Sequence, residues 1–326
     1  MDHTRTLAVV SDIHYASAAE QARGQDYEFR EIANPLLRLA AKLYRHYIWL
    51  RDPLHQSHLL DTFLANGDSF DYVIANGDYS CNTAFVGMSD DASFASAQEC
   101  LRKLRHRFGD RFRATYGDHE LGKKSMFGGR GGMMLASLRR THNELKLPPF
   151  WQLEIGNYVL MGVASSLIAL PIFESETLPS ETPEWQRLRA ELLEDIRKAF
   201  NAIKPAQRIL LFCHDPTALP FLRLEPSVRA RLPQIEQTII GHLHTNIVLW
   251  ESRLLAGMPP IHFLGNTARR LSTSLNQARR WRPFNVRLCP ALAGVQLVKG
   301  GGYLTIRLDP SAREPAQFQF HRIARR

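Results

Sequence analysis

Acidic residues are missing from one long stretch of this 326-residue chain: none occurs between Ser252 and Leu308. Nine Lys and Arg residues lie in the same stretch, and their summed charge equals the whole formal net charge of +9. The rest of the chain is therefore neutral. This distribution argues against a generally cationic nucleic-acid coat. It predicts either one local surface that meets an anion or an Arg-rich solvated loop.

Cysteines and long hydrophobic runs are also scarce. The four cysteines form no CxxC pair, so the sequence predicts neither a disulfide framework nor a structural zinc knot. The most apolar window, residues 158–173, contains Gly, Ser and Pro and is shorter than the roughly 20 residues that a spanning helix needs. Only six residues precede the first apolar run at Leu7. We therefore expect a cytoplasmic protein without a transmembrane anchor.

Apolar runs recur along the chain without a repeat or a linker-like stretch, which predicts one domain over residues 1–326. We expect it to carry a helical insertion at about residues 34–64 and a basic, strand-rich C-terminal segment at about residues 252–326. Short continuous apolar runs predict strands buried on both faces of a sheet flanked by helices. These runs cover residues 7–10, 72–75, 112–116, 208–213 and 238–240.

Helical periodicity and paired strands fill the sequence between these runs. Apolar residues at three- and four-residue steps predict helices over residues 183–203, with Thr182 as the N-cap, and over about 92–108. Residues 151–170, broken at Gly156-Asn157, predict a pair of strands, and so do residues 294–308, joined across 299–302.

Each of the five apolar runs ends in residues that bind metals or move protons. In an open α/β sheet the carboxyl ends of the strands converge on one crevice, so these residues are expected to share a site. Carboxylates mixed with imidazoles suit Mn, Fe or Zn, and two such ions could activate a water for attack on phosphate. The five strand ends are Asp12-Ile13-His14, Gly77-Asp78, Gly117-Asp118-His119-Glu120, His214 and Gly241-His242-Leu243-His244.

In this order, the five motifs resemble those of the calcineurin-like metallophosphoesterases, D-x-H, G-D, G-N-H-[DE], a lone H and G-H-x-H. The resemblance spans about residues 7–245. It implies an α/β fold, namely a four-layer αββα sandwich of two facing mixed sheets flanked by helices. The tail from Ile261 onward would supply strands of the second sheet. It also implies a two-metal-dependent phosphohydrolase that cleaves a phosphoester or pyrophosphate bond with metal-activated water.

The resemblance further implies a role for each motif residue. His119 would act as general acid for the leaving oxygen or as an electrostatic stabiliser. Asp118 departs from the family pattern because an Asn normally stands there, and it adds a negative charge to the site. The implied ligands are Asp12, His14 and His244 for the first ion, Asp118, His214 and His242 for the second, and Asp78 as the bridge.

Substrate contacts are expected outside the motifs. Arg130, in the Gly-rich segment 127–132, is a candidate phosphate-binding residue, and a mobile surface loop is the alternative. Arg269 and Arg270 in the acid-free stretch are further candidates because the guanidinium fork suits phosphate. Trp281, between basic residues, could stack on a base.

Residues 34–51 combine an apolar stripe with basic and aromatic residues. Such a segment predicts either an amphipathic helix that lies on an anionic membrane or an ordinary helix that packs on a core. The apolar stripe consists of Leu36, Leu39, Leu43, Tyr47 and Leu50.

Three hypotheses of function follow. The first is a phosphohydrolase whose substrate is a small or lipid-linked phosphate, so that its partner is an anionic, phosphate-containing molecule. The second is a nuclease or cyclic-nucleotide phosphodiesterase with the same site, which is less favoured because nucleic acid would need a longer basic and aromatic groove. The third is a non-catalytic interaction protein, which loss of ligand residues would favour, and none is lost.

Overall fold

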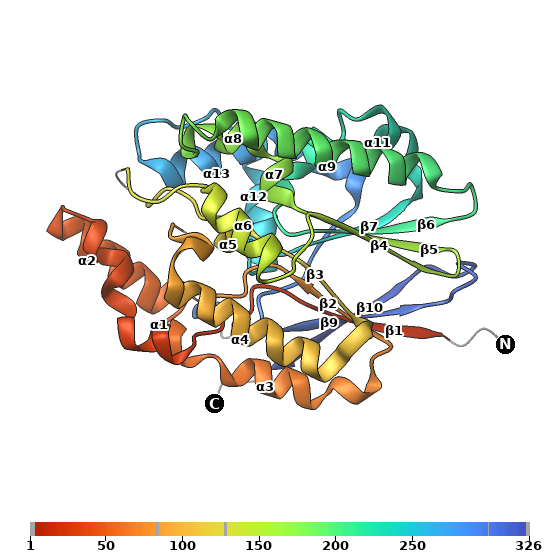
Figure 1. Cartoon of the computed structure of the whole chain (residues 1–326), viewed down its shortest axis with the longest axis horizontal. Coiled ribbons are helices and arrows are strands. Elements are labelled where there is room, and N and C mark those ends of the chain that lie inside the picture. Colours follow the sequence, from red (N-terminus) through yellow and green to blue (C-terminus); the bar gives the residue numbers. More distant parts are fainter. Residues whose placement is uncertain (1–3, 82–84, 127–128, 299, 324–326) are drawn as a thin grey trace.

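The computed structural model describes residues 4–81, 85–126, 129–298 and 300–323. Their strands form two five-stranded mixed sheets that face each other, with helices outside both (Figure 1). The first sheet has the order β10-β9-β1-β2-β3 and the second the order β4-β5-β6-β7-β8. The strands are β1 (Arg5–Val10), β2 (Tyr72–Asn76), β3 (Phe112–Thr115), β4 (Phe150–Ile155), β5 (Tyr158–Val163), β6 (Arg208–Cys213), β7 (Ile235–Ile240), β8 (Val286–Leu288), β9 (Gly301–Leu308) and β10 (Gln317–Ile323).

The helices cover the outer face of each sheet. Figure 1 shows α3 and α4 beneath the first sheet and α9, α8 and α11 above the second, so the predicted αββα sandwich is confirmed. The helices are α1 (Ala18–Arg23), α2 (Pro35–Tyr44), α3 (His58–Ala65), α4 (Asp91–Phe108), α5 (Asp118–Leu121), α6 (Leu135–Asn143), α7 (Ser165–Ile168), α8 (Leu170–Phe173), α9 (Thr182–Ala202), α10 (Leu219–Leu222), α11 (Pro226–Arg231), α12 (Asn246–Leu254) and α13 (Asn266–Gln277). A π-helical turn, η2 (Arg45–Trp49), extends α2, and η10 (Ala278–Phe284) follows α13.

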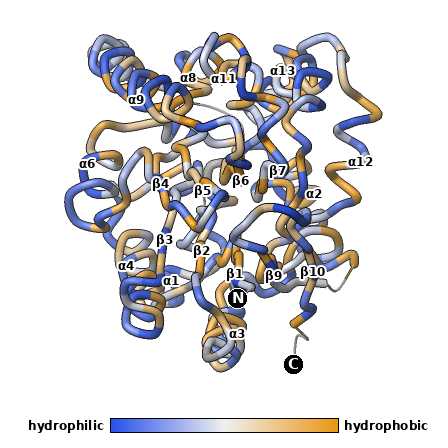
Figure 2. Tube along the Cα trace, turned by 90° about the vertical axis from the view of Figure 1, so that its right-hand side faces the viewer, coloured by the Kyte–Doolittle hydropathy of each residue, from blue (hydrophilic) through white to orange (hydrophobic). Residues whose placement is uncertain are grey.

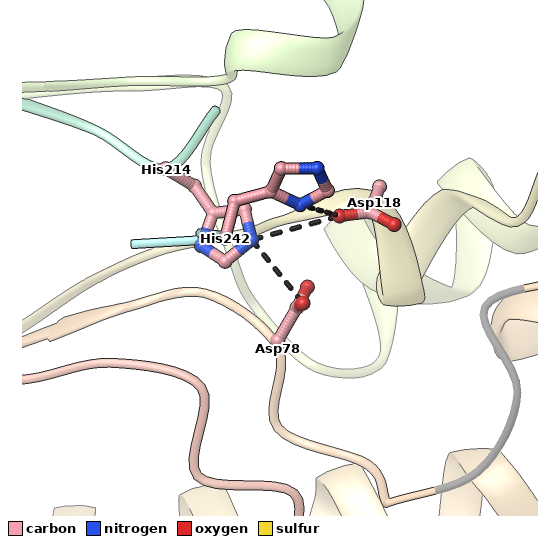
Figure 3. A group of neighbouring side chains, drawn as sticks. All are labelled: Asp78, Asp118, His214 and His242. Atoms are coloured by element: carbon pink, nitrogen blue, oxygen red, sulfur yellow. Dashed lines mark ion pairs between the residues drawn. The ribbon is translucent and has the colours of Figure 1, made fainter. Parts of the chain in front are cut away.

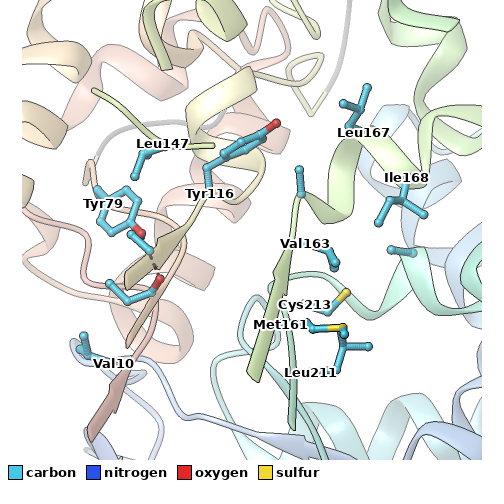
Figure 4. Close-up of a cluster of buried hydrophobic side chains, with 14 of the residues drawn as sticks. Val10, Tyr79, Tyr116, Leu147, Met161, Val163, Leu167, Ile168, Leu211 and Cys213 are labelled. Carbon is cyan, nitrogen blue, oxygen red and sulfur yellow. Dashed lines mark hydrogen bonds between the residues drawn. The ribbon is translucent and has the colours of Figure 1, made fainter. Parts of the chain in front are cut away.

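Both faces of the central strands are buried, as their continuous apolar runs predict. In β1, Leu7 and Val9 pack in the cluster between the two sheets, whereas Ala8 and Val10 pack in the cluster beneath the helices. Figure 4 shows part of this helix-side cluster, with Val10 at one sheet and Met161 at the other. Because successive strand residues point to opposite faces, a strand covered on both sides needs an apolar residue at every position.

The two predicted helices are confirmed as α9 and α4, with a small correction. The N-cap of α9 is Glu181, and Thr182 is its first residue, followed by Pro183 at a position where the missing N–H costs nothing. For α4, the side chain of Asp90 accepts a hydrogen bond from the amide of Ser93, which satisfies a donor at the first turn.

The two predicted strand pairs need correction. Residues 150–163 do form the hairpin β4-β5, but the strand ends at Val163, and residues 165–173 form α7 and α8. The described residues of 294–308 contain one strand, β9, and Val295 makes only an isolated bridge to Gly300. The physical reason is that the amides of Gln296 and Leu297 donate to the carbonyls of Trp49 and Ile48. Lys299, at the expected turn, lies outside the described residues.

The C-terminal segment is less rich in strands than predicted and divides between the sheets. Only β8 joins the second sheet, while β9 pairs with β1 and β10 and so extends the first. Residues 266–284 are helical, and the buried Leu275 and Ala278 are three residues apart, which is a helical spacing. None of the described helices is long and apolar enough to cross a membrane.

Candidate metal centre

The chain bends sharply where the strands deliver the predicted ligands. Five of these residues have positive φ angles, between 50° and 60°, which are unfavourable for residues other than glycine. Such conformations cost of order 1–3 kcal/mol each and persist where the surrounding structure holds a functional site in place. The five residues are Asp12, His14, Asp78, His242 and His244.

Two of the motif positions need glycine because a larger side chain would not fit, and not because the chain turns there. A Cβ atom at Gly117 would lie 2.2 Å from Asp78 Oδ1, and one at Gly241 would lie 2.6 Å from Asp12 Oδ2. Gly77, by contrast, has a φ of +91° and does make a turn. Glycine at positions 117 and 241 therefore lets side chains from different strands approach one another.

The first group of candidate ligands comprises Asp12, His14 and His244, all buried. His244 Nε2 lies 3.2 Å from Asp12 Oδ1 and 3.3 Å from His14 Nε2. Burial lowers the pKa of His14 to about 3, so its imidazole is neutral, as a metal ligand must be. Against the effect of burial, His244 and His214 hold the pKa of Asp12 at about 2, so its carboxylate is charged.

The second group comprises Asp78, Asp118, His214 and His242 (Figure 3). His214 Nε2 lies 3.2 Å from Asp78 Oδ2, and His242 Nδ1 lies 2.8 Å from Asp118 Oδ1. Although they lie this close to oppositely charged groups, two buried atoms, Asp118 Oδ1 and His214 Nε2, have no partner in hydrogen-bond geometry among the described residues. Buried polar atoms are almost always paired, so these two fit ligands of a cation.

His119 lies at the junction of the two groups. Its Nε2 is 3.7 Å from Asp78 Oδ2, and its ring centroid is 4.8 Å from that of His14. Burial lowers the pKa of His119 below its ordinary value, although Asp78 and Asp118 oppose the shift. The side chain therefore faces the space between the candidate ligands.

Glu120 is a positioning residue to which sequence reasoning assigned no role. Its carboxylate accepts hydrogen bonds from the amides of Asp78, Tyr79 and Gly117, at 3.1, 2.9 and 2.7 Å. Burial and the nearby Asp78 raise the pKa of Glu120 to about 7. The only sequence signal for this role of Glu120 was its position, as an acidic residue directly after His119 in the third motif.

A family model for calcineurin-like phosphoesterases matches residues 5–246. The chain belongs to this family. The phosphoesterase is thus a metal-dependent hydrolase of phosphoesters, and its Asp and His groups could hold metal ions.

Comparison with individual proteins adds little. Among solved structures, the phosphoesterase is similar to the phosphopantetheinyl hydrolase of Mycobacterium tuberculosis, with 14% identity and a TM-score of 0.35 over 75% of this chain and 84% of that one. A search of curated proteins gives no match.

Lys123 compensates for the charge that Asp118 adds to the phosphoesterase. Its Nζ forms an ion pair with Asp118 Oδ2. Although burial opposes it, Lys123, together with His242, holds the pKa of Asp118 well below its usual range. The pair thus restores the charge balance that a neutral Asn would give.

Replacement of Lys123 by Met should raise KM for an anionic substrate about tenfold, because Asp118 then repels phosphate. The double variant Lys123→Met/Asp118→Asn should return KM close to the wild-type value. Steady-state kinetics of the two variants measure these changes in KM. An unchanged KM in the single variant would show that Lys123 does not balance this charge.

Of the predicted phosphate-binding residues, Arg270 alone lines the cavities beside the candidate ligands. Its guanidinium also makes hydrogen bonds of 2.8 and 2.9 Å to the buried carboxylate of Glu176. Arg269 donates to the same carboxylate at 3.3 Å. Arg130 instead lies over the rings of Tyr27 and Phe85, so it approaches the wall of the cavity through Phe85 but is not among the residues that line it. Residues 127 and 128 of its Gly-rich segment lie outside the described residues.

Replacement of Glu176 by Ala should lower the free energy of unfolding by about 3–5 kcal/mol, because it leaves Arg270 without its buried partner. Chemical denaturation measures the change. Glu184→Ala, which removes an exposed pair with Arg187, is the control and should leave the stability unchanged. Equal losses in both variants would contradict the structural role of Glu176.

Proposed function

We propose that the protein is a two-metal-dependent phosphohydrolase that cleaves a phosphoester or pyrophosphate bond. One observation supports the proposal: the candidate ligand Asp78 lies close to Asp118, His214 and His242, and also to His14, which in turn groups with Asp12 and His244. Two ions of Mn, Fe or Zn bound there would supply an activated water and neutralise charge on the phosphate. Asp78 would help to hold both ions.

The protein's own residues supply the remaining chemistry. His119, beside Asp78, is placed to give a proton to the leaving oxygen. Trp49 packs on His244 with ring centroids 4.4 Å apart, and this contact orients the imidazole and excludes water from one side. Arg270 lines the adjoining space and would hold the anionic substrate.

The cavities support a substrate with groups on both sides of the phosphate. One cavity, of about 310 Å³, has apolar walls that include Phe29, Leu50 and Phe85. The other, of about 410 Å³, has polar residues such as Asp215 and Thr217 beside apolar ones such as Phe173 and Leu271. Both cavities include His119, Lys123, His244 and Arg270, so they meet at the candidate ligands.

These features favour a lipid-linked phosphodiester or pyrophosphate over a nucleic acid. Apolar walls suit a hydrocarbon chain better than a charged polynucleotide. Trp281, which was expected to stack on a base, lines the second cavity but is only 4% exposed, so it offers little surface for stacking. The basic stretch around it also contributes to a helix instead of a long groove.

A substrate panel tests the proposal. The Mn-loaded protein should hydrolyse lipid-linked pyrophosphates or phosphodiesters at a higher kcat/KM than nucleotides, bis-aryl phosphodiesters and single-stranded DNA. A preference for single-stranded DNA or cyclic nucleotides would overturn the substrate class. Absence of turnover on every ester, in protein that binds Mn, would overturn the activity itself.

A further inference from the structure

Helix α2 and the turn η2 expose the apolar stripe that the sequence predicted. None of the residues of α2 is buried, and Leu36, Leu39 and Tyr47 are all more than half exposed. Leu50, the last residue of the stripe, is buried. A helix that packs on its own core would cover these leucines. The structure thus exposes large apolar side chains side by side, which usually marks an interaction site.

The basic side of the same helix faces inward. Arg38 Nε donates to the carbonyl of Ile32 at 2.9 Å, and Lys42 Nζ pairs with Asp26 at 2.8 Å. Lys42 also lies over the ring of Phe29, 5.7 Å from its centroid. These contacts hold α2 in one orientation. Its leucines therefore face outward in the folded protein.

Two neighbouring segments continue the exposed apolar surface. Leu297 is tied to η2 because its amide donates to the carbonyl of Ile48 at 3.1 Å. Helix α12 lines a cavity together with Tyr44 and Trp49 of the α2–η2 segment, and it exposes Trp250 and Leu254. Figure 2 places α2 and α12 along one side of the molecule. The outer apolar rim is defined as Leu36, Leu39, Tyr47, Trp250, Leu254 and Leu297, which are between 55% and 77% exposed.

The charge around the outer apolar rim is mostly positive, and Glu251, beside Trp250, is its exposed acidic neighbour in α12. No acidic residue occurs in residues 32–51 or 252–308, the segments that supply most of the rim and its surroundings. Four exposed arginines of these segments pair with no acidic residue among the described residues. They are Arg51, Arg253, Arg279 and Arg280. Such a combination of apolar side chains with unpaired cations is complementary to an anionic lipid surface.

We propose that the outer apolar rim docks the protein on an anionic membrane surface. Leucines of the rim would enter the boundary between headgroups and acyl chains, with Tyr47 and Trp250 at headgroup level. Exposed residues that also line the cavities, Tyr44, Met126 and Leu271, place the cavity mouth beside the rim. The docking does not depend on the proposed function, since it requires no turnover.

Vesicle co-sedimentation tests the docking. The full chain should sediment with vesicles of phosphatidylcholine containing phosphatidylglycerol and much less with phosphatidylcholine alone, and high salt should weaken the binding. The variant Leu36→Gln/Leu39→Gln should bind about a hundredfold more weakly, about tenfold for each leucine removed from the lipid. Leu224→Gln, at an equally exposed leucine just before α11, is the matched control and should bind as wild type.

Two further readouts distinguish membrane docking from misfolding of the variant and from self-association. Circular dichroism of the double variant should match that of wild type, and its turnover of a water-soluble ester should be unchanged. Failure of the wild type to sediment, or equal binding by the double variant, would overturn the proposal. A wild-type dimer that the double variant converts to monomer would also overturn it, because a second copy would then cover the rim.

Discussion

Replacement of Asp78 by Asn is expected to lower turnover by about four orders of magnitude and to remove bound metal. Asn keeps the size of the side chain and the acceptor that the amide of His119 uses, at 3.2 Å from Asp78 Oδ1. It lacks the negative charge and the second carboxylate oxygen that a bridging ligand would provide. Loss of several kcal/mol of charge stabilisation corresponds to this reduction in rate.

Plasma mass spectrometry of the purified variant, together with its turnover in excess Mn, measures both effects. Glu99→Gln, which alters a carboxylate that accepts a hydrogen bond from Tyr15 and belongs to neither ligand group, is the control. It should keep the wild-type metal content and rate. Wild-type metal content in Asp78→Asn would refute the assignment of Asp78 as the bridge.

Replacement of His119 by Ala is expected to lower turnover by about 10²- to 10⁴-fold while metal binding is retained. His119 is not one of the ligands that the family resemblance implies, and its ring lies beside both Asp78 and His14. Loss of a general acid has this magnitude, and the loss should depend on the leaving group. An alkoxide needs the proton, whereas a nitrophenolate leaves without it.

The ratio of the activity losses on an alkyl ester and on a nitrophenyl ester therefore identifies the role of His119. The variant should lose much more activity on an alkyl ester than on a nitrophenyl ester. Equal losses on both esters would indicate electrostatic stabilisation of the phosphate instead of proton transfer. A variant as fast as wild type would exclude both roles.

Much of the fold followed from local features of the sequence. Continuous apolar runs such as residues 7–10 and 208–213 predicted strands covered on both faces, because a single exposed face would place polar residues at alternate positions. Their ends predicted the gathering of Asp12, Asp78 and His214, since parallel strands bring their carboxyl ends to one edge. The order of five motifs along the chain was enough to indicate the family.

The sequence was least informative where a contact joins distant segments. Residues 294–300 have the composition of a strand, yet the amides of Gln296 and Leu297 are taken by Trp49 and Ile48, about 250 positions away. The part played by Glu120 likewise depends on three amides that converge only in the folded chain. Local patterns carry no information about such partners.

The sequence by itself therefore indicated the class of fold, the reaction class and the candidate residues of the ligand groups, because these depend on strand periodicity and on the chemistry of residues at strand ends. Tertiary structure decided that Lys123 forms an ion pair with Asp118 and that Arg270 forms one with Glu176. It also decided that Arg130 lies over the ring of Tyr27. It also decided the orientation of α2. A hydrophobic stripe has the same period whether it faces a core or solvent, and only the packing of Arg38 and Lys42 against residues 26–32 turns its leucines outward.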